Sequence, residues 1–461
     1  MTTSATPRTR LAPPAAGAAG LRATALVVVL GSFMSVLDTT AVNTAMRTLG
    51  RSFGAPLTTI QWVATGYTLA LATVIPVTAW AVGRIGAKRL YLTALVLFGA
   101  GSALAGLAWN TESLVAFRVL QGLGGGMLTP VGMTLVLRAS GPERTGRAMA
   151  VLGLPVLLGP LAGPILGGAL LDAASWRWIF FINPPVAAVA ILLAARILPH
   201  EVPRPGRRLD LFGLLLLSPG LSMLIYGLTH GRDPAFMLTG GAMVLGFIAR
   251  ALTCDHPLLD LRLLARRPFA AAAGSEVLFV CAYFGSLILL PLYYQGLRGQ
   301  SAAHSGLLGI PQALATGVTM QFAGRLIDRH PPGRIVLTGV LVATTGFLAF
   351  TVQVTDDVPF WHLQTALAVL GVGVGLTMMP TIAAATRSVA AEQVPLATTA
   401  VTILQQVAAS TGTALMSVLL THAQRTAPHP ADAFRHTYGW AVALMGLALL
   451  PALLLPRRQP E

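Results

Sequence analysis

Charged residues are scarce in this chain. Only 10% of its 461 residues are Asp, Glu, Lys or Arg, whereas 54% are hydrophobic and the mean hydropathy is +0.72. A soluble domain carries about 25% charged residues, so the composition excludes a water-soluble globular protein. Most of the chain must face lipid, and we predict an all-α polytopic membrane protein.

Cysteine and lysine are almost absent. The two cysteines, Cys254 and Cys281, provide neither a disulfide framework nor the spacing of a metal site. Lys88 is the single lysine, so the net charge of +15 comes almost entirely from arginine. The basic residues lie in short clusters between apolar runs, which excludes the basic face of a nucleic-acid-binding domain.

Motifs for ATP hydrolysis and for enzymatic chemistry are missing as well. The sequence has no Walker A loop, no HExxH motif and no GxSxG motif with plausible partners. We therefore expect no enzymatic activity, no cofactor and no metal. The chain thus carries no motif for an ATP-driven process.

Long apolar runs, in contrast, are abundant. About 20 apolar residues cross a bilayer, and by this measure the sequence contains fourteen candidate spans. They cover residues 24–46, 59–82, 89–108, 113–137, 148–171, 178–198, 210–229, 235–253, 269–294, 304–326, 334–354, 361–386, 396–421 and 437–456.

Two polar segments, 201–210 and 255–268, divide these spans into groups of six, two and six. We predict five regions in chain order: a disordered tail at 1–23, a six-helix bundle at 24–200, two extra helices with their linkers at 201–268, a second six-helix bundle at 269–456, and a short tail at 457–461.

Arginine placement predicts the orientation of the spans, because cytoplasmic loops are enriched in Lys and Arg. With the N-terminus in the cytoplasm, the tails and the loops on that side hold 23 of the 31 basic residues; seven lie on the other side and Arg118 lies within a span. We therefore predict a multi-pass protein of the cell (inner, cytoplasmic) membrane, with both termini in the cytoplasm.

The two six-helix groups share a short basic motif. VGRIGAKR (82–89) follows the second span of the first group, and AGRLIDRHPPGR (323–334) follows the second span of the last group. The same Gly-Arg pattern at the same place suggests a duplicated six-helix unit, as in transporters built from repeats around a central site.

Four further motifs are present: LDTTAVN (37–43), RVLQG (118–122), the segment from Gly159-Pro160 to Gly167-Gly168, and WRWIFFINP (176–184). With these motifs the chain resembles the fourteen-span drug:proton antiporter branch of the major facilitator superfamily, from about residue 30 to 455. The resemblance implies a major facilitator fold of two six-helix bundles with two extra linker helices. It also implies proton-coupled export by alternating access.

The resemblance assigns cytoplasmic gating to the loops after the second helix of each bundle. The residues concerned are Arg84, Gly86, Arg89, Gly324, Arg325, Asp328 and Arg329. The family usually has an acid where this chain has Gly83, whereas the second copy keeps its acid, Asp328. A gating ion pair is therefore expected in the second half only.

Glycine and proline are concentrated in the fifth span. Gly159, Gly163 and Gly167 recur every four residues, so they line one face of a helix and allow a neighbouring helix to approach closely. Pro160 and Pro164 remove helical hydrogen bonds and favour a kink. With Gly168 they complete the motif that the resemblance associates with antiporters. Close packing alone and a joint between moving parts both fit this pattern.

Three ionisable residues stand out well inside the spans, where each costs at least about 2.5–3.5 kcal/mol near the bilayer centre. At a helical rise of about 1.5 Å per residue, Asp38 and Arg118 lie at similar depths below the outer ends of their spans. An acid whose surroundings alternate between an apolar site and an arginine can load and release a proton. Asp38 is thus the leading candidate for the proton site, with Arg118 as its tuning charge. A static ion pair is the alternative.

The third residue, Glu276, has no evident counter-ion in the sequence. It could bind a cationic substrate, carry a second proton, or form hydrogen bonds as a neutral acid. Polar residues in or next to the spans are candidates for the substrate cavity: Asn43, Gln121, Gln295, Gln312, Gln405 and Gln406. Such amides also commonly join helices through hydrogen bonds.

The leading functional prediction is a proton-driven exporter of amphiphilic small molecules. Cationic drugs, dyes or antibiotics and secondary metabolites or lipids remain open as substrates. An uptake symporter of the same superfamily and a non-transporting sensor or scaffold are the rival interpretations. The expected partners are protons, the substrate and the lipid bilayer, with no nucleic acid, and we expect a monomer.

Overall fold

The fold was analysed in a computed structural model of the chain. The structure describes residues 18–55, 57–140, 151–199, 209–229, 234–254, 257–258, 261–300, 302–355, 357–390 and 393–456. The linker at 201–208 and the tails at 1–17 and 457–461 lie outside these residues.

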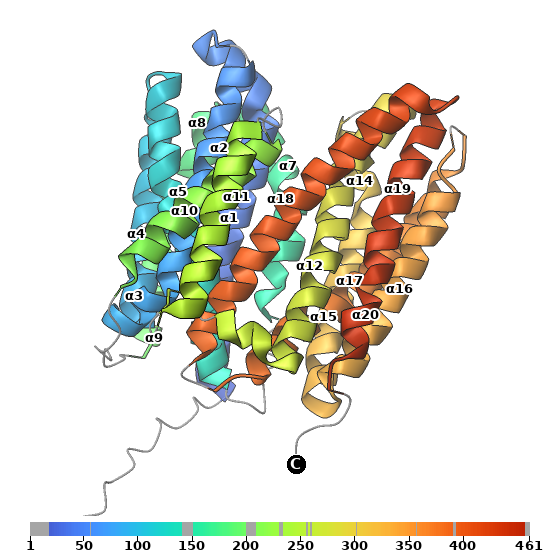
Figure 1. The fold of residues 1–461 in the computed structure, drawn as a ribbon. Helices are drawn as coiled ribbons and strands as arrows, with labels where there is room; N and C mark the ends of the chain where they lie inside the picture. Colours follow the sequence, from blue (N-terminus) through green and yellow to red (C-terminus); the bar gives the residue numbers. More distant parts are fainter. Residues whose placement is uncertain are drawn as a thin grey trace, which may run out of the picture.

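The first bundle is a set of long helical rods (Figure 1). In chain order it comprises α1 (Ala18–Phe53), α2 (Leu57–Val74) continued by η1 (Ile75–Val77) and α3 (Thr78–Ile85), α4 (Ala87–Gly106), α5 (Thr111–Ser140), α7 (Leu154–Ala173), and α8 (Arg177–Phe181) followed by α9 (Asn183–Ile197). The next two rods are α10 (Leu211–Thr229) and α11 (Pro234–Thr253), and a short turn, η3 (Leu261–Ala265), follows them.

The second bundle repeats this arrangement. It comprises α12 (Arg267–Leu287) continued by α13 (Leu289–Pro291) and η4 (Leu292–Leu297), α14 (Ala302–Leu308) with α15 (Ile310–Arg329), α16 (Pro332–Val352), α17 (Phe360–Arg387), α18 (Val394–Thr426), and α19 (Pro430–Leu447) with α20 (Leu449–Leu453). The described residues form no β-strand.

The all-α membrane architecture predicted from the sequence is confirmed. Eleven helices within the described residues are long and apolar enough to span a membrane. The other three predicted spans, 148–171, 210–229 and 304–326, coincide with α7, α10 and α14–α15, which stand beside the other rods (Figure 1). The predicted helix ends are less accurate: α1 begins at Ala18, inside the segment predicted to be a disordered tail, and runs on to Phe53.

The extra helices α10 and α11 lie between the bundles along one side. They pack against each other, and α10 also contacts α2 of the first bundle and α18 of the second. The contact with α2 is polar, since Ser218 Oγ donates to the carbonyl of Thr73 (2.7 Å) and the Thr73 and Ser222 hydroxyls lie 3.0 Å apart.

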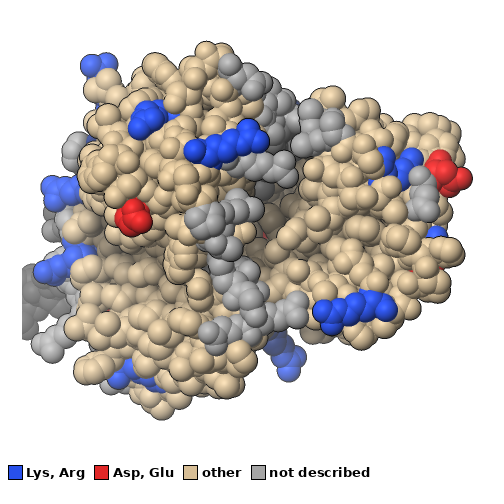
Figure 2. All heavy atoms as spheres, turned by 90° about the horizontal axis from the view of Figure 1, so that it is seen from above, with Lys and Arg blue, Asp and Glu red and all other residues tan. Residues whose placement is uncertain are grey.

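The two bundles meet at one end of the molecule and part at the other. Helix α18 leans from the second bundle toward the first at the end where α20 finishes (Figure 1). There, buried hydroxyl pairs join the bundles: Thr78 with Thr399 (3.0 Å) and Thr134 with Thr398 (3.2 Å). Seen from the opposite end, the surface is hollowed between two lobes, and most of the visible wall is uncharged (Figure 2).

The single lysine has a structural role in this arrangement. Lys88 is buried at the start of α4, and its Nζ donates to the carbonyls of Ala195 and Leu198 at 2.7 Å each. These carbonyls belong to the C-terminal end of α9, where helical carbonyls lack partners and a cation is favoured. Lys88 therefore fastens the end of α9 to α4.

Replacing Lys88 with Met should lower the stability of the first bundle. The substitution leaves two carbonyls without their charged donor, and we expect a cost of about 1–3 kcal/mol. Thermal unfolding of the purified protein would measure this as a lower midpoint. Arg89→Met is the control, because Arg89 is exposed on the next position of the same helix and should leave the midpoint unchanged.

Candidate functional site

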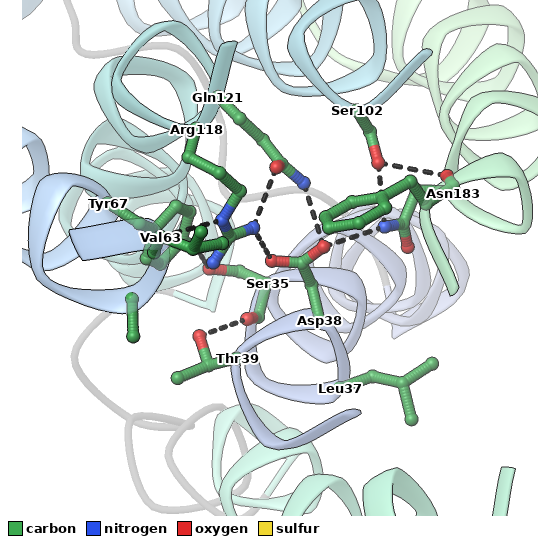
Figure 3. Close-up of polar contacts among 12 residues, drawn as sticks. Ser35, Leu37, Asp38, Thr39, Val63, Tyr67, Ser102, Arg118, Gln121 and Asn183 are labelled. Atoms are coloured by element: carbon green, nitrogen blue, oxygen red, sulfur yellow. Dashed lines mark hydrogen bonds and ion pairs between the residues drawn. The ribbon is translucent and has the colours of Figure 1, made fainter. Parts of the chain in front are cut away.

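A cluster of polar side chains lies inside the first bundle, centred on Asp38 of α1 (Figure 3). Arg118 Nη1 forms an ion pair with Asp38 Oδ2. Two amides hold the other carboxylate oxygen: Oδ1 accepts from Gln121 Nε2 (2.9 Å) and from Asn183 Nδ2 (3.0 Å). Asp38, Arg118, Gln121 and Asn183 are each at most 1% exposed.

Arg118 is held on several sides at once. Its Nη1 also donates to Gln121 Oε1 (2.7 Å), its Nε donates to the carbonyl of Val63 (3.3 Å), and its guanidinium lies 4.1 Å from the centre of the Tyr67 ring. Stacking on an aromatic face stabilises a cation that has left water. These contacts hold the planar guanidinium of Arg118 in position against the Asp38 carboxylate.

Asn183 and Ser102 belong to the same hydrogen-bonded cluster, although neither was among the candidates predicted from the sequence. Asn183 Nδ2 donates to Asp38 Oδ1 and also to Ser102 Oγ (3.0 Å), and Ser102 donates to the carbonyl of Phe180 (2.9 Å). These bonds connect α1 to α4, α8 and α9 (Figure 3). Asn183 could have been identified from its place in the WRWIFFINP motif. Ser102 is a small residue in an apolar helix, and no sequence pattern marks it.

A small cavity adjoins the carboxylate between α1, α7 and α8–α9. Asp38, Gly167 and Asn183 are among its lining residues, and the ≈ 10 Å³ open to the centre of a water molecule is at the lower limit for holding one water. The Asp38 carboxylate is thus buried, yet it borders a small space between these helices.

The glycines of the fifth span face α1, which confirms the close approach predicted from their spacing. A Cβ atom built on Gly159 would lie 2.2 Å from Val36 Cγ1, and one built on Gly163 would lie 1.9 Å from Thr40 Oγ1. Thr40 also donates to the carbonyl of Gly159 (3.1 Å). The side chains of Pro160 and Pro164 lie outside the described part of the chain, and a hinge role for this segment stays a prediction.

Glu276 lies in the second bundle, far along the chain from the Asp38 cluster. It is 1% exposed on α12, and its Oε1 accepts a hydrogen bond from Gln405 Nε2 of α18 (2.6 Å). Its Oε2 has no hydrogen-bond partner among the described residues. The structure therefore brings together two of the predicted residues, Glu276 and Gln405.

The other predicted amides are dispersed. Gln312 is buried and donates to the Tyr283 hydroxyl (3.3 Å), which joins α15 to α12. Asn43 and Gln295 are exposed, and Gln406 is half-buried next to Gln405. None of these four belongs to the Asp38 cluster.

The loop motifs differ between the two halves, as their sequences do. In the second half, Asp328 pairs with Arg387 across 3.6 Å and joins α15 to α17, while Arg325 and Arg329 are exposed and Gly324 is buried. In the first half, Arg84 and Arg89 are exposed and flank Gly86, whose φ of 87° forms the sharp turn between α3 and α4. A role for these residues in gating stays a prediction.

These features define a class of protein. Two bundles joined at one end, a hollow between them at the other, and a buried acid–arginine pair in one bundle are typical of a transporter that alternates between two faces of a membrane.

Comparison with known proteins assigns the family. The Major Facilitator Superfamily profile matches residues 28–413 and 273–461. A Mycobacterium tuberculosis protein described as "Multidrug resistance protein B homolog" is 43% identical over 416 residues, which is 87% of this chain and 77% of that protein. The chain therefore belongs to the major facilitator superfamily, whose members are transporters rather than enzymes.

Further relatives and solved structures agree. "Multidrug export protein EmrB" of Haemophilus influenzae is 30% identical over 417 residues, covering 88% of this chain and 82% of that protein. The proton:xylose symporter XylE shares the fold, with a TM-score of 0.68 over 94% of this chain and 95% of that one, at 14% identity. The major facilitator fold predicted from the sequence is thus confirmed.

Proposed function

We propose that this protein is a proton-coupled exporter of amphiphilic small molecules, and that Asp38 is its proton site. It would act as a monomer in the cytoplasmic membrane, with both termini in the cytoplasm and with the bundles 24–200 and 269–456 flanking the two extra helices. Alternating access between the bundles would carry the substrate outward.

The observation that carries the proposal is the setting of the Asp38 carboxylate. Both of its oxygens are occupied by three donors, of which one, Arg118, carries a permanent charge. A proton on Asp38 removes the attraction to Arg118, so the contact between α1 and α5 weakens. Loss of that proton restores the ion pair, and protonation is thereby linked to the packing of two helices.

The substrate class follows from the hollow and from the relatives. The visible wall of the hollow is mostly uncharged (Figure 2), which suits molecules with a large apolar part. Two of the relatives are described as multidrug export or resistance proteins. We extend that description to this chain as part of the proposal, and it covers cationic as well as neutral amphiphiles.

Replacing Asp38 with Asn should abolish uphill transport while the protein stays folded. Asparagine keeps an oxygen that Arg118 can contact, but it cannot exchange a proton. In proteoliposomes with an acidic lumen, wild-type protein should accumulate ethidium, a permanently charged dye, whereas Asp38→Asn should fall to the level of protein-free vesicles. Thermal unfolding would confirm that the variant is folded.

The matched control is Asp210→Asn. Asp210 is also a buried acid paired with an arginine, Arg250 (2.8 Å), but the pair joins α11 to the start of α10 rather than lying in the first bundle. This variant should transport normally. Normal accumulation by Asp38→Asn would refute the assignment of the proton site, and accumulation only with an alkaline lumen would indicate a symporter.

A further inference from the structure

The second bundle contains a buried carboxyl group in surroundings opposite to those of Asp38. Three helices pack around Glu276 and leave no space for a water molecule: Ala272 and Ala273 of α12, Thr381, Ile382 and Ala385 of α17, and Val401 and Leu404 of α18. None of these residues is charged or titratable. The only polar contact of the carboxyl group in the described residues is the amide of Gln405.

Glu276 and Asp38 occupy related places in the two bundles. Each lies on the first helix of its bundle, close to a glycine of the fifth helix. Gly163 of α7 meets α1 at Thr40, two residues after Asp38; Gly412 of α18 meets α12 at Cys281, five residues after Glu276, where an added Cβ would lie 2.0 Å from the Cys281 carbonyl oxygen. Each bundle thus carries a buried acid on its first helix, near the contact with its fifth helix.

Their electrostatic settings determine which form each acid takes here. An ionised carboxylate in an apolar interior requires a counter-charge, and Asp38 has Arg118. Among the described residues Glu276 has one neutral donor on Oε1 and none on Oε2, so ionisation would leave an uncompensated charge. The neutral acid fits the site, with the proton on Oε2.

Helix α18 connects this acid to the joint between the bundles. Thr398 and Thr399, which pair with Thr134 and Thr78 of the first bundle, lie about 9–11 Å along the helix from Gln405 at 1.5 Å per residue. Each hydroxyl bond is worth only about 0.5–1.5 kcal/mol. If the bundles part at this end, α18 loses its hold on the first bundle and the cover over Glu276 is released.

We propose that Glu276 is a second proton-binding site, which holds its proton in the conformation seen here and releases it when α18 leaves the first bundle. The O–H bond at Oε2 breaks, and the proton passes to water entering at the opened end. The proposal rests on the alternating access of the proposed function, but it concerns a group other than Asp38 and predicts a second coupled proton.

Infrared spectroscopy of the purified protein in lipid tests this directly, because a protonated carboxyl group has its own carbonyl stretch. Wild-type protein at neutral pH should show a buried carboxyl band, and Glu276→Gln should lose it. Asp38→Asn should keep the band, and so should Glu112→Gln, which makes the same chemical change at an exposed acid.

The double variant Thr398→Val/Thr399→Val, called the latch variant below, removes the hydroxyl pairs that join the two bundles. It should weaken the contact between the bundles at this end and expose Glu276. We expect the band to be lost at neutral pH in this variant and to return on acidification. Thr402→Val is the control, since among the described residues that hydroxyl donates only to the Thr398 carbonyl within its own helix, and its band should match that of wild-type protein.

Two results would overturn the proposal. Absence of a Glu276-dependent band in wild-type protein would mean that the acid is ionised, as a cation-binding group would be. A band that the latch variant keeps at all pH values would mean a static structural acid. Neither result bears on Asp38, whose role is decided by uphill transport of ethidium.

Discussion

Replacing Gly163 with Ala is expected to abolish export and to lower the thermal unfolding midpoint, whereas Gly168→Ala should change neither. Both glycines belong to the same motif on α7. A Cβ on Gly163 would lie 1.9 Å from Thr40 Oγ1 and 2.5 Å from Thr40 Cβ, whereas no atom of the described side chains and backbone lies within 4 Å of a Cβ on Gly168. Only the first substitution forces α1 and α7 apart.

The expected cost of Gly163→Ala follows from overpacking, which typically destabilises by about 1–3 kcal/mol. The effect on transport should be larger than this figure suggests, because α1 also carries Asp38. A shift of α1 away from α7 changes the distance between Asp38 and its donors on α5 and α9. Ethidium accumulation and thermal unfolding, measured on the same preparations, separate the two effects.

A Gly163→Ala protein that transports like Gly168→Ala would show that close approach of α7 to α1 is not required. In that case the glycine face of α7 would serve packing alone. Loss of stability with normal export would lead to the same conclusion, because a substitution in a moving joint should also impair the transport cycle.

The depth of a residue along its helix was predictable from the sequence. The face of the helix on which the residue lies was only partly predictable. A constant rise of about 1.5 Å per residue placed Asp38 and Arg118 at matching depths, and the structure pairs them. Asn43 lies five residues after Asp38, which is about 140° around the helix at 3.6 residues per turn. It is accordingly exposed and belongs to another face.

Contacts between distant segments account for what the sequence could not predict. Asn183 and Gln405 lie 145 and 129 residues from the acids they contact, and only the packing of α9 and α18 brings them there. The spans themselves were predictable because each must satisfy its own backbone hydrogen bonds in lipid. Helix ends outside lipid lack that constraint, and α1 accordingly extends past both predicted ends.

The two buried acids suggest a division of labour between the bundles. Asp38 has a charged partner and is connected through its network to α2, α4, α5, α8 and α9, so its protonation would alter packing inside the first bundle. Glu276 has no charged partner in the described residues, and its cover depends on how α18 meets the other bundle. Binding of a proton to Asp38 would therefore depend on helix packing within the first bundle, and binding of a proton to Glu276 would depend on the relative position of the two bundles.

Replacing Arg118 with Met should uncouple transport from the proton gradient. Methionine fills part of the space but removes the charge, which leaves Asp38 with two amide donors in a buried site. An unpaired buried charge costs about 3–5 kcal/mol, so Asp38 should keep its proton throughout the cycle. Ethidium should then equilibrate down its own gradient without accumulating against it.

The double variant Asp38→Asn/Arg118→Met provides the decisive comparison. It removes both charges, so its unfolding midpoint should be higher than that of Arg118→Met alone, and the thermodynamic cycle of the four proteins measures the coupling between the two side chains. Uphill accumulation by Arg118→Met would contradict the assignment of Arg118 as the tuning charge. Additive midpoints would contradict the pairing itself. A large coupling together with loss of accumulation is the outcome that a switching ion pair requires, because the same attraction must both stabilise the packed state and be broken by the proton.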